Sequence, residues 1–269
     1  MASASGAVNK ATYYRDHWLE IDAQRLGAYQ QLFQWHPAME PLLAAAEIAP
    51  GQVVVDYGCG PGGLAVELAR RVADGGHVHG VELNETFVAQ ARENLSTEGF
   101  SETTTVHHIT DDRVPLGDGA ADRLVCKNVL EYVTHYDAVI AEFYRVVKPG
   151  GIVHVIDSDW GMMALEPLGR TQLAELIEAA SCAYKTPLIG RLLYSELKKA
   201  GFAQVAVKII TSADIRGRML PVLVNMIEYA RVGGMSKERA DDLLGQIKRA
   251  VVDQTFMFVL PQFLVTAIK

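Results

Sequence analysis

The sequence has few cysteines and no long apolar run, and each shortage excludes a class of protein. Three cysteines among 269 residues, far apart and odd in number, predict reduced thiols and neither a disulfide framework nor a zinc site. No segment approaches the roughly 20 unbroken apolar residues of a bilayer span. The small, polar first ten residues lack the apolar region of a signal peptide. We therefore expect a soluble, cytoplasmic protein without a membrane partner.

Positive charge is also scarce, since 25 Lys and Arg residues stand against 32 Asp and Glu, a formal net charge of −7. The basic clusters are no longer than pairs such as Arg70-Arg71, whereas binding a phosphate backbone requires clustered Lys and Arg. Nucleic acid is therefore not an expected partner. The pairs His77/His79 and His107/His108 stand in strand-like runs without carboxylate or thiolate ligands at metal-binding spacing, so no metal site is predicted.

Apolar periodicity divides the chain into four parts. Residues 1–48 form a tail and a helical cap, and residues 49–211 form a core in which β-branched runs alternate with helical patterns. Residues 212–255 form a helical insert, and residues 256–269 carry the last strand of the core, opened by Pro261. The alternation predicts parallel βαβ units and thus an α/β fold. The expected strands lie at 53–55, 77–82, 103–109, 123–126, 152–156, 203–210 and 256–268.

A glycine loop follows the first of these strands. Gly58, Gly60 and Gly62 stand between a buried strand and a helix, where glycines allow a sharp turn and a close approach to a ligand. Dinucleotide-binding folds use a similar loop, and they also place an acid after the second strand to accept hydrogen bonds from ribose hydroxyls. Glu82 occupies that place. A NAD-dependent oxidoreductase is therefore the competing interpretation.

Three details favour a different cofactor. Asp56 precedes the first glycine, where a carboxylate would repel a pyrophosphate but attract the cationic sulfonium and ammonium of S-adenosylmethionine. Cys59 completes the pattern Asp-x-Gly-Cys-Gly-x-Gly, and Lys148-Pro149-Gly150-Gly151 comes just before a strand. With these residues the chain resembles the class I S-adenosylmethionine-dependent methyltransferases over about 51–202. Within them it is similar to the small-molecule branch of quinone-biosynthesis and natural-product enzymes.

The resemblance implies a fold and a cofactor site. The fold is a Rossmann-like, seven-stranded mixed sheet with flanking helices and an antiparallel last strand. The loop would surround the methionine moiety, Glu82 would bind the ribose, and Leu83 would pack on the adenine. The adenine amino group would be read by a residue of 110–112, for which Asp111 is preferred. The cofactor-binding residues implied are Tyr14, Asp56, Gly58, Cys59, Gly60, Gly62, Glu82, Leu83, Thr110, Asp111, Asp112, Lys127 and Asn128, the last two near the transferring methyl.

Side chains near the methyl acceptor are harder to choose, because positioning and desolvation can carry much of a methyl transfer without a general base. On the N-terminal helix, an aromatic side chain such as Tyr14 could shield the sulfonium or simply anchor the helix. The segment 128–132 lacks the Pro-Pro of methyltransferases that act on nucleobase or glutamine nitrogens. Catalytic candidates are His17, Glu131 and Asp159; substrate-binding candidates are Trp18, Tyr132 and Trp160.

These observations lead to one preferred function. We expect the methyl of S-adenosylmethionine to move, by in-line displacement, to O, N or C of a small aromatic or apolar metabolite, leaving S-adenosylhomocysteine. The alternatives are a NAD-dependent oxidoreductase, a protein methyltransferase, and a methyltransferase-like binding protein without turnover. The helical insert is a candidate lid or dimer contact, so the sequence leaves both a monomer and a homo-oligomer as alternatives.

Overall fold

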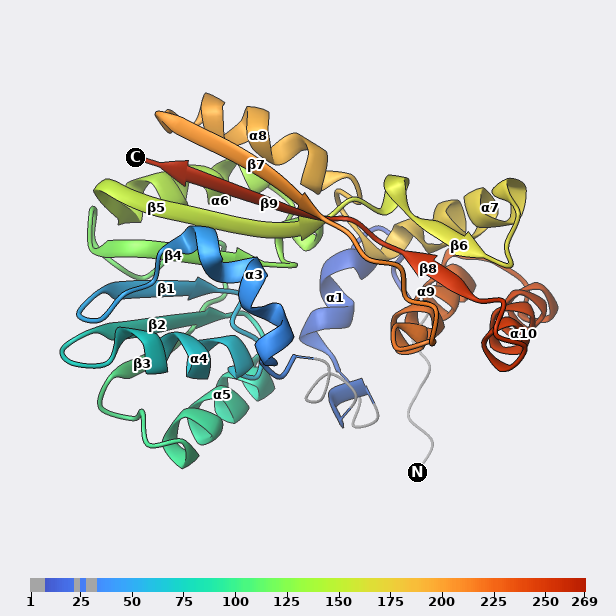
Figure 1. Ribbon diagram of the computed structural model, residues 1–269, viewed down its shortest axis with the longest axis horizontal. Helices are drawn as coiled ribbons and strands as arrows, with labels where there is room; N and C mark the ends of the chain where they lie inside the picture. The colour runs from blue at the N-terminus through green and yellow to red at the C-terminus, as the bar shows by residue number, and fades with distance from the viewer. Residues whose placement is uncertain (1–7, 22–24, 28–32) are drawn as a thin grey trace.

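A seven-stranded sheet forms the centre of the computed structural model, which describes residues 8–21, 25–27 and 33–269. Its strand order is β3-β2-β1-β4-β5-β9-β7, seen on the left of Figure 1. β9 runs antiparallel to both of its neighbours, β5 and β7. The expected mixed sheet with an antiparallel last strand is therefore confirmed. The strands are β1 (Val53–Tyr57), β2 (His77–Glu82), β3 (Thr104–His108), β4 (Ala121–Lys127), β5 (Val147–Ser158), β7 (Gln204–Ile210) and β9 (Gln262–Ile268).

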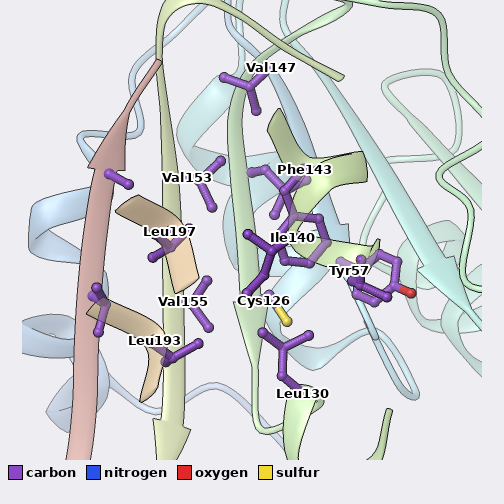
Figure 2. Close-up of a cluster of buried hydrophobic side chains, with 14 of the residues drawn as sticks. Tyr57, Cys126, Leu130, Ile140, Phe143, Val147, Val153, Val155, Leu193 and Leu197 are labelled. Carbon is purple, nitrogen blue, oxygen red and sulfur yellow. The ribbon is translucent and has the colours of Figure 1, made fainter. Parts of the chain in front are cut away.

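Helices cover both faces of this sheet and bury it. α4 (Gly63–Val72) and α5 (Glu85–Thr97) pack on one face, and α6 (Tyr136–Val146) and α8 (Ile189–Lys199) pack on the other. Figure 2 shows α6 and α8 side chains beside the valines of β5. Central strands buried on both faces need continuous apolar runs, and each buried Val, Leu or Ile contributes about 1.5–3 kcal/mol. This packing fixes where the strands end, and so where a ligand can bind.

A second lobe with its own core lies beyond the ends of the strands, on the right of Figure 1. It draws on two stretches of chain, 160–184 and 219–260, so the insert expected at 212–255 is only part of it. A two-stranded sheet, which the sequence analysis did not anticipate, ties the stretches together. The elements of this second lobe are η4 (Trp160–Met162), β6 (Ala164–Glu166), α7 (Arg170–Ala180), η5 (Ser181–Ala183), α9 (Leu220–Gly233), α10 (Lys237–Val252) and β8 (Met257–Val259).

The N-terminal elements connect the two lobes. α1 (Tyr13–Leu19) lies between the end of the sheet and the second lobe (Figure 1). η1 (Pro37–Met39), α3 (Glu40–Leu43) and η2 (Ala44–Ala46) follow it. Of the helical pattern expected before residue 48, residues 22–24 and 28–32 lie outside the described part of the chain. Within the described part, no helix combines the length and the apolar character needed to cross a membrane.

Two local expectations need correction or refinement. Lys148–Gly151 was expected to form a turn, but β5 already begins at Val147 and continues through it. The strand tolerates this because Gly150 takes a φ of 77° and the pairing with β4 shifts register after Ala121. Pro261 divides the last expected strand into β8 and β9, in keeping with a residue that has no N–H for a sheet ladder.

Candidate functional site

One cavity of about 730 Å³ opens where the carboxyl ends of β1, β2, β4 and β5 meet. Ligands of open α/β sheets bind at this edge. Of the nineteen site residues expected from the sequence, thirteen line the cavity: Trp18, Asp56, Gly58, Cys59, Gly60, Glu82, Leu83, Asp112, Lys127, Asn128, Glu131, Tyr132 and Trp160. The other six do not line it: Tyr14, His17, Gly62, Thr110, Asp111 and Asp159.

The glycine loop adopts a backbone that only glycine accepts easily. Gly58, Gly60 and Gly62 have φ values of 75°, 53° and 89°, in the left-handed region. Space is also short, because a Cβ on Gly58 would lie 2.3 Å from a methyl group of Val129. Gly62 is the N-cap of α4, so the free N–H groups of that helix begin at the end of the loop. The loop thus brings bare backbone to the wall of the cavity.

Glu82, the last residue of β2, holds this loop in place. Its Oε2 accepts the N–H of Gly60 at 2.8 Å, and its Oε1 accepts the N–H groups of Leu83 and Asn84, each at 2.8 Å. Burial raises the pKa of the carboxyl, while the three hydrogen bonds oppose that rise by favouring the anion. The acid expected to bind a ribose therefore also positions the loop beside it.

Asp56 carries a buried oxygen without a partner. The residue is 1% exposed, and its Oδ2 has no hydrogen bond to any described residue. Burial raises the pKa of this carboxyl to about 7; the nearby Glu82 raises it further, and Lys127 lowers it. Because an unpaired buried polar atom is costly, such an oxygen suits a ligand that brings a cation or a donor. The amide oxygen of Asn128, also at the cavity, is unpaired in the same way.

On the adenine side, the structure distinguishes among the residues expected there. Leu83 and Asp112 line the cavity together with Ile109. Thr110 and Asp111 are exposed, and the Asp111 carboxylate accepts the N–H of Arg113 at 3.1 Å. The choice of Asp111 stays an untested prediction, but this geometry favours Asp112 over it.

The far half of the cavity has aromatic walls around one buried carboxyl. The indole N–H of Trp160 donates to Glu131 at 2.5 Å, and Glu131 is 2% exposed. Burial, reinforced by the negative charge of Asp157, raises the pKa of Glu131 well above its usual range. Tyr184 stacks on Tyr132 with ring centroids 5.6 Å apart. This half therefore offers flat apolar surfaces and few polar contacts.

Comparison with known proteins agrees with this geometry. Residues 54–151 match a family model described as a methyltransferase domain. A ubiquinone/menaquinone biosynthesis C-methyltransferase of Cupriavidus metallidurans is 35% identical over 115 residues, 43% of this chain and 46% of that protein. Residues 54–151 are therefore similar to methyltransferase domains, and the strand order and glycine loop agree with the class I S-adenosylmethionine-dependent fold.

Two further similarities show how far the resemblance to known proteins extends. An uncharacterized 37.1 kDa protein in a transposon of Streptomyces fradiae is 32% identical over 221 residues, 79% of this chain and 59% of that protein. The chain thus spans about half the length of the curated relatives it matches. Phosphoethanolamine N-methyltransferase 2 of Haemonchus contortus, in complex with phosphomonomethylethanolamine and S-adenosylhomocysteine, shares the fold. Its TM-score is 0.64 at 20% identity, over 97% of this chain and 60% of that one.

The N-terminal helix α1 covers the cavity, yet only part of it faces inward. Trp18 lines the cavity and Tyr14 does not, although the hydroxyl of Tyr14 hydrogen-bonds the lining residue Thr134 at 2.7 Å. His17 is buried among aromatic rings, and burial lowers its pKa to about 4. Its Nδ1 bonds the carbonyl of Tyr13, which leaves a neutral ring packed beside the cavity wall.

Asp159 is buried away from the cavity. Its carboxylate forms an ion pair with Arg191 of α8, which donates at 2.8 Å, and also accepts the N–H of Gly161 at 3.0 Å. These bonds join η4 to α8 and occupy both carboxylate oxygens. A catalytic role for Asp159 is not tested directly, but the structure does not bring this side chain to the other candidates.

Several residues of the site were missed from the sequence. Asn84 caps α5 and donates to the carbonyls of Trp18 and Leu19, so it holds α1 over the cavity. The Asn-Glu pair at the start of a helical pattern is a recognisable cap signal. Tyr184 and Tyr229 line the acceptor half, but they come from separate helical segments. Only the packing of the second lobe brings them together.

Proposed function

We propose that this protein transfers the methyl group of S-adenosylmethionine to O, N or C of a small acceptor with an aromatic or apolar body. The observation that carries the proposal is the unpaired, buried carboxylate oxygen of Asp56. It stands beside the glycine loop in the same cavity that continues to the aromatic walls. Opposite charges attract strongly where water is excluded, so this oxygen fits the cationic end of such a cofactor.

The residues present fit the cofactor along its whole length. Asp56 and the glycine loop would hold the methionine end, Glu82 the ribose, and Leu83 with Asp112 the adenine. When bound, the cofactor supplies a methyl group on a positively charged sulfur, which is the electrophile of the reaction. A pyrophosphate would instead meet the carboxylate of Asp56, which argues against a NAD-dependent oxidoreductase.

The chain itself contributes orientation and exclusion of water. α1, held by Asn84, closes one side of the cavity, and α9 closes another with Met219, Val222 and Tyr229. An acceptor held between such walls meets the methyl in a fixed direction and without competing water, the effects that accelerate a displacement most. Burial and the nearby Asp157 raise the pKa of Glu131 well above its usual range, which favours the uncharged form of this side chain.

The aromatic lining limits the acceptor class. Rings from Trp18, Tyr132, Trp160, Tyr184, Tyr229 and Phe258 line the cavity, and flat apolar walls favour a flat apolar ligand. The C-methyltransferase relative is named for ubiquinone and menaquinone biosynthesis, which supports testing ring compounds first. We propose the part of the second lobe around α9 as the lid that selects among them.

Thermal melting with added ligands tests this proposal at its first step. We expect S-adenosylhomocysteine to raise the melting temperature and NAD to leave it unchanged, since binding to the folded state stabilises by mass action. Isotope-labelled S-adenosylmethionine with a panel of naphthols, hydroxybenzoates and catechols then identifies the acceptor. Stabilisation by NAD and not by S-adenosylhomocysteine would overturn the proposal.

A further inference from the structure

The wall of the cavity holds a half-buried cation to which the proposed function has so far given no partner. Lys127 is the last residue of β4 and lines the cavity. Its ammonium makes no hydrogen bond and no ion pair within the described part of the chain. Taking an ammonium out of water is costly unless another group pairs with it. A lysine in this position is therefore set up to meet a ligand.

Three carboxyl groups influence Lys127 without hydrogen-bonding it. Burial lowers the pKa of the lysine, while Asp157, Asp56 and Glu131, in that order, raise it. Two of these acids are already engaged elsewhere. Asp157 accepts the backbone N–H groups of Leu130 at 3.0 Å and Ser158 at 2.9 Å, and Glu131 accepts the indole of Trp160. Their charges favour the protonated form of Lys127, but their hydrogen-bonding capacity is directed at other donors.

The position of Lys127 points toward the acceptor rather than toward the adenine. Lys127 pairs in register with Ile156 of β5, beside Asp157, and β5 is the strand that leads into Trp160 and the aromatic walls. The adenine side of the cavity, at Leu83 and Asp112, belongs to β2 and the segment after β3. β4, which ends at Lys127, lies between β1 with Asp56 and β5, which leads to the aromatic walls, and all of these line the same cavity.

We propose that the ammonium of Lys127 binds an ionised hydroxyl of the acceptor, a phenolate or an enolate. This rests on the proposed function, and it narrows the acceptor to a ring or conjugated system with an acidic hydroxyl. An amine acceptor in its cationic form would be repelled by the lysine, whereas an oxyanion supplies the charge and the hydrogen-bond acceptor that the lysine lacks.

The role of Lys127 is to favour the anion that reacts. The hydroxyl proton leaves to solvent as the acceptor binds, because a nearby cation lowers the pKa of the hydroxyl. The oxygen, or a carbon conjugated to it, then uses its electron pair to form the bond to the methyl carbon. The pair of the broken carbon–sulfur bond stays on sulfur. Lys127 keeps its proton throughout and acts as a positioning and charge-stabilising group.

A coloured phenol tests this without the cofactor. 4-Nitrophenol absorbs visible light only as its anion, so a spectroscopic pH titration at saturating protein reports its pKa in the bound state. In the wild type we expect the bound pKa to lie below that of the free phenol, equivalent to at least about a tenfold preference for the anion. In Lys127→Met that preference is lost. 4-Nitroanisole, which has the same ring and no acidic hydrogen, is expected to bind both proteins equally.

Controls separate this inference from the proposed function. Lys248→Met removes an exposed lysine on α10 and is expected to behave as the wild type. Lys127→Gln is the second variant should Lys127→Met fail to fold, and melting temperatures verify both. S-adenosylhomocysteine affinity, measured by calorimetry on the same samples, decides the cofactor separately.

Two results would overturn the inference. One is a wild type that does not bind 4-nitrophenol or does not lower its pKa. The other is a Lys127 variant that binds the anion as the wild type does, above all if its affinity for S-adenosylhomocysteine falls about tenfold. That second pattern would assign the lysine to the carboxylate of the cofactor.

Discussion

The Oε2 atom of Glu82 accepts the backbone N–H of Gly60 at 2.8 Å, so the end of β2 and the loop after β1 form one unit. The loop is therefore held by a side chain from the neighbouring strand as well as by its own turn. Any change at Glu82 alters two parts of the cofactor site at once, the ribose position and the path of the loop.

Replacing Glu82 by Gln tests this unit. Gln keeps one carbonyl acceptor but loses the charge and the second acceptor, and hydrogen bonds to charged groups are worth about 1.5–3 kcal/mol. We expect the Kd for S-adenosylhomocysteine to rise between about 10-fold and 100-fold by calorimetry. Glu93→Gln, an exposed acid on α5, should leave the Kd unchanged. Equal Kd values for Glu82→Gln and wild type would show that neither ribose nor loop depends on this carboxylate.

Comparing Gly58→Ala with Gly51→Ala separates the cost of a left-handed backbone from the cost of a steric clash. A Cβ there would lie 2.3 Å from Val129, while Gly51 has a similar φ of 79° and open space around it. Gly51→Ala should therefore cost only the left-handed backbone, about 1–2 kcal/mol. Gly58→Ala should cost more in urea denaturation and should weaken S-adenosylhomocysteine binding. Adding Val129→Ala should recover part of both losses; no recovery would mean that the contact does not limit the loop.

The stability of the ligand-free protein should fall with rising pH because of Asp56. Its pKa is about 7 in the folded state and about 3.9 when unfolded, so between these values the folded state retains a proton that the unfolded state has lost. The free energy of unfolding then decreases with pH, by at most about 1.4 kcal/mol per pH unit. Asp56→Asn should remove this contribution.

Urea denaturation of wild type and Asp56→Asn at several pH values between 4 and 8 measures the difference. Asp157 and Glu131, whose pKa values are also raised, remain in both proteins, so the comparison isolates Asp56. The affinity of the wild type for S-adenosylmethionine should increase as pH rises through about 7, because only the anion attracts its cations. Parallel stability profiles for the two proteins would contradict the assignment.

Asn84→Asp should loosen α1 while sparing the cap of α5. The Asp oxygen can still accept the N–H of Phe87, but the donors to the carbonyls of Trp18 and Leu19 are lost. We expect faster hydrogen exchange in residues 13–19 and faster release of S-adenosylhomocysteine, with a small change in global stability. Asn84→Ala removes the cap as well and should cost about 0.5–2 kcal/mol more. Unchanged exchange in Asn84→Asp would separate α1 from this contact.

The sheet could be read from the sequence because its signals are local. β-branched runs mark buried strands, and His77–Glu82 was predicted with the bounds that β2 has. The glycine loop could be read for the same reason, since each glycine meets a local backbone demand. The strand through Lys148–Gly151 was missed because its pairing with β4 and with the end of the chain is not visible in the local pattern.

The acceptor side could be predicted only in part, because its geometry depends on contacts between distant segments. Asp159 follows β5 as a site acid would, yet Arg191 of α8 pairs with it and turns it away from the cavity. His17 was a catalytic candidate, but the helix turns it among aromatic rings. Glu131 and Trp160 were both chosen, while the hydrogen bond that links them required the fold.

The place of β9 between β5 and β7 has a consequence for how the protein is made. Both neighbours precede β9 in the chain, and it pairs with each of them along seven residues. During synthesis β5 and β7 are therefore complete while each still presents an unpaired edge, the kind that invites wrong pairing with other chains. The sheet closes only when the residues of β9 leave the ribosome. The sheet thus cannot complete its pairing before β9 has been synthesised, and until then β5 and β7 are the strands most exposed to wrong pairing.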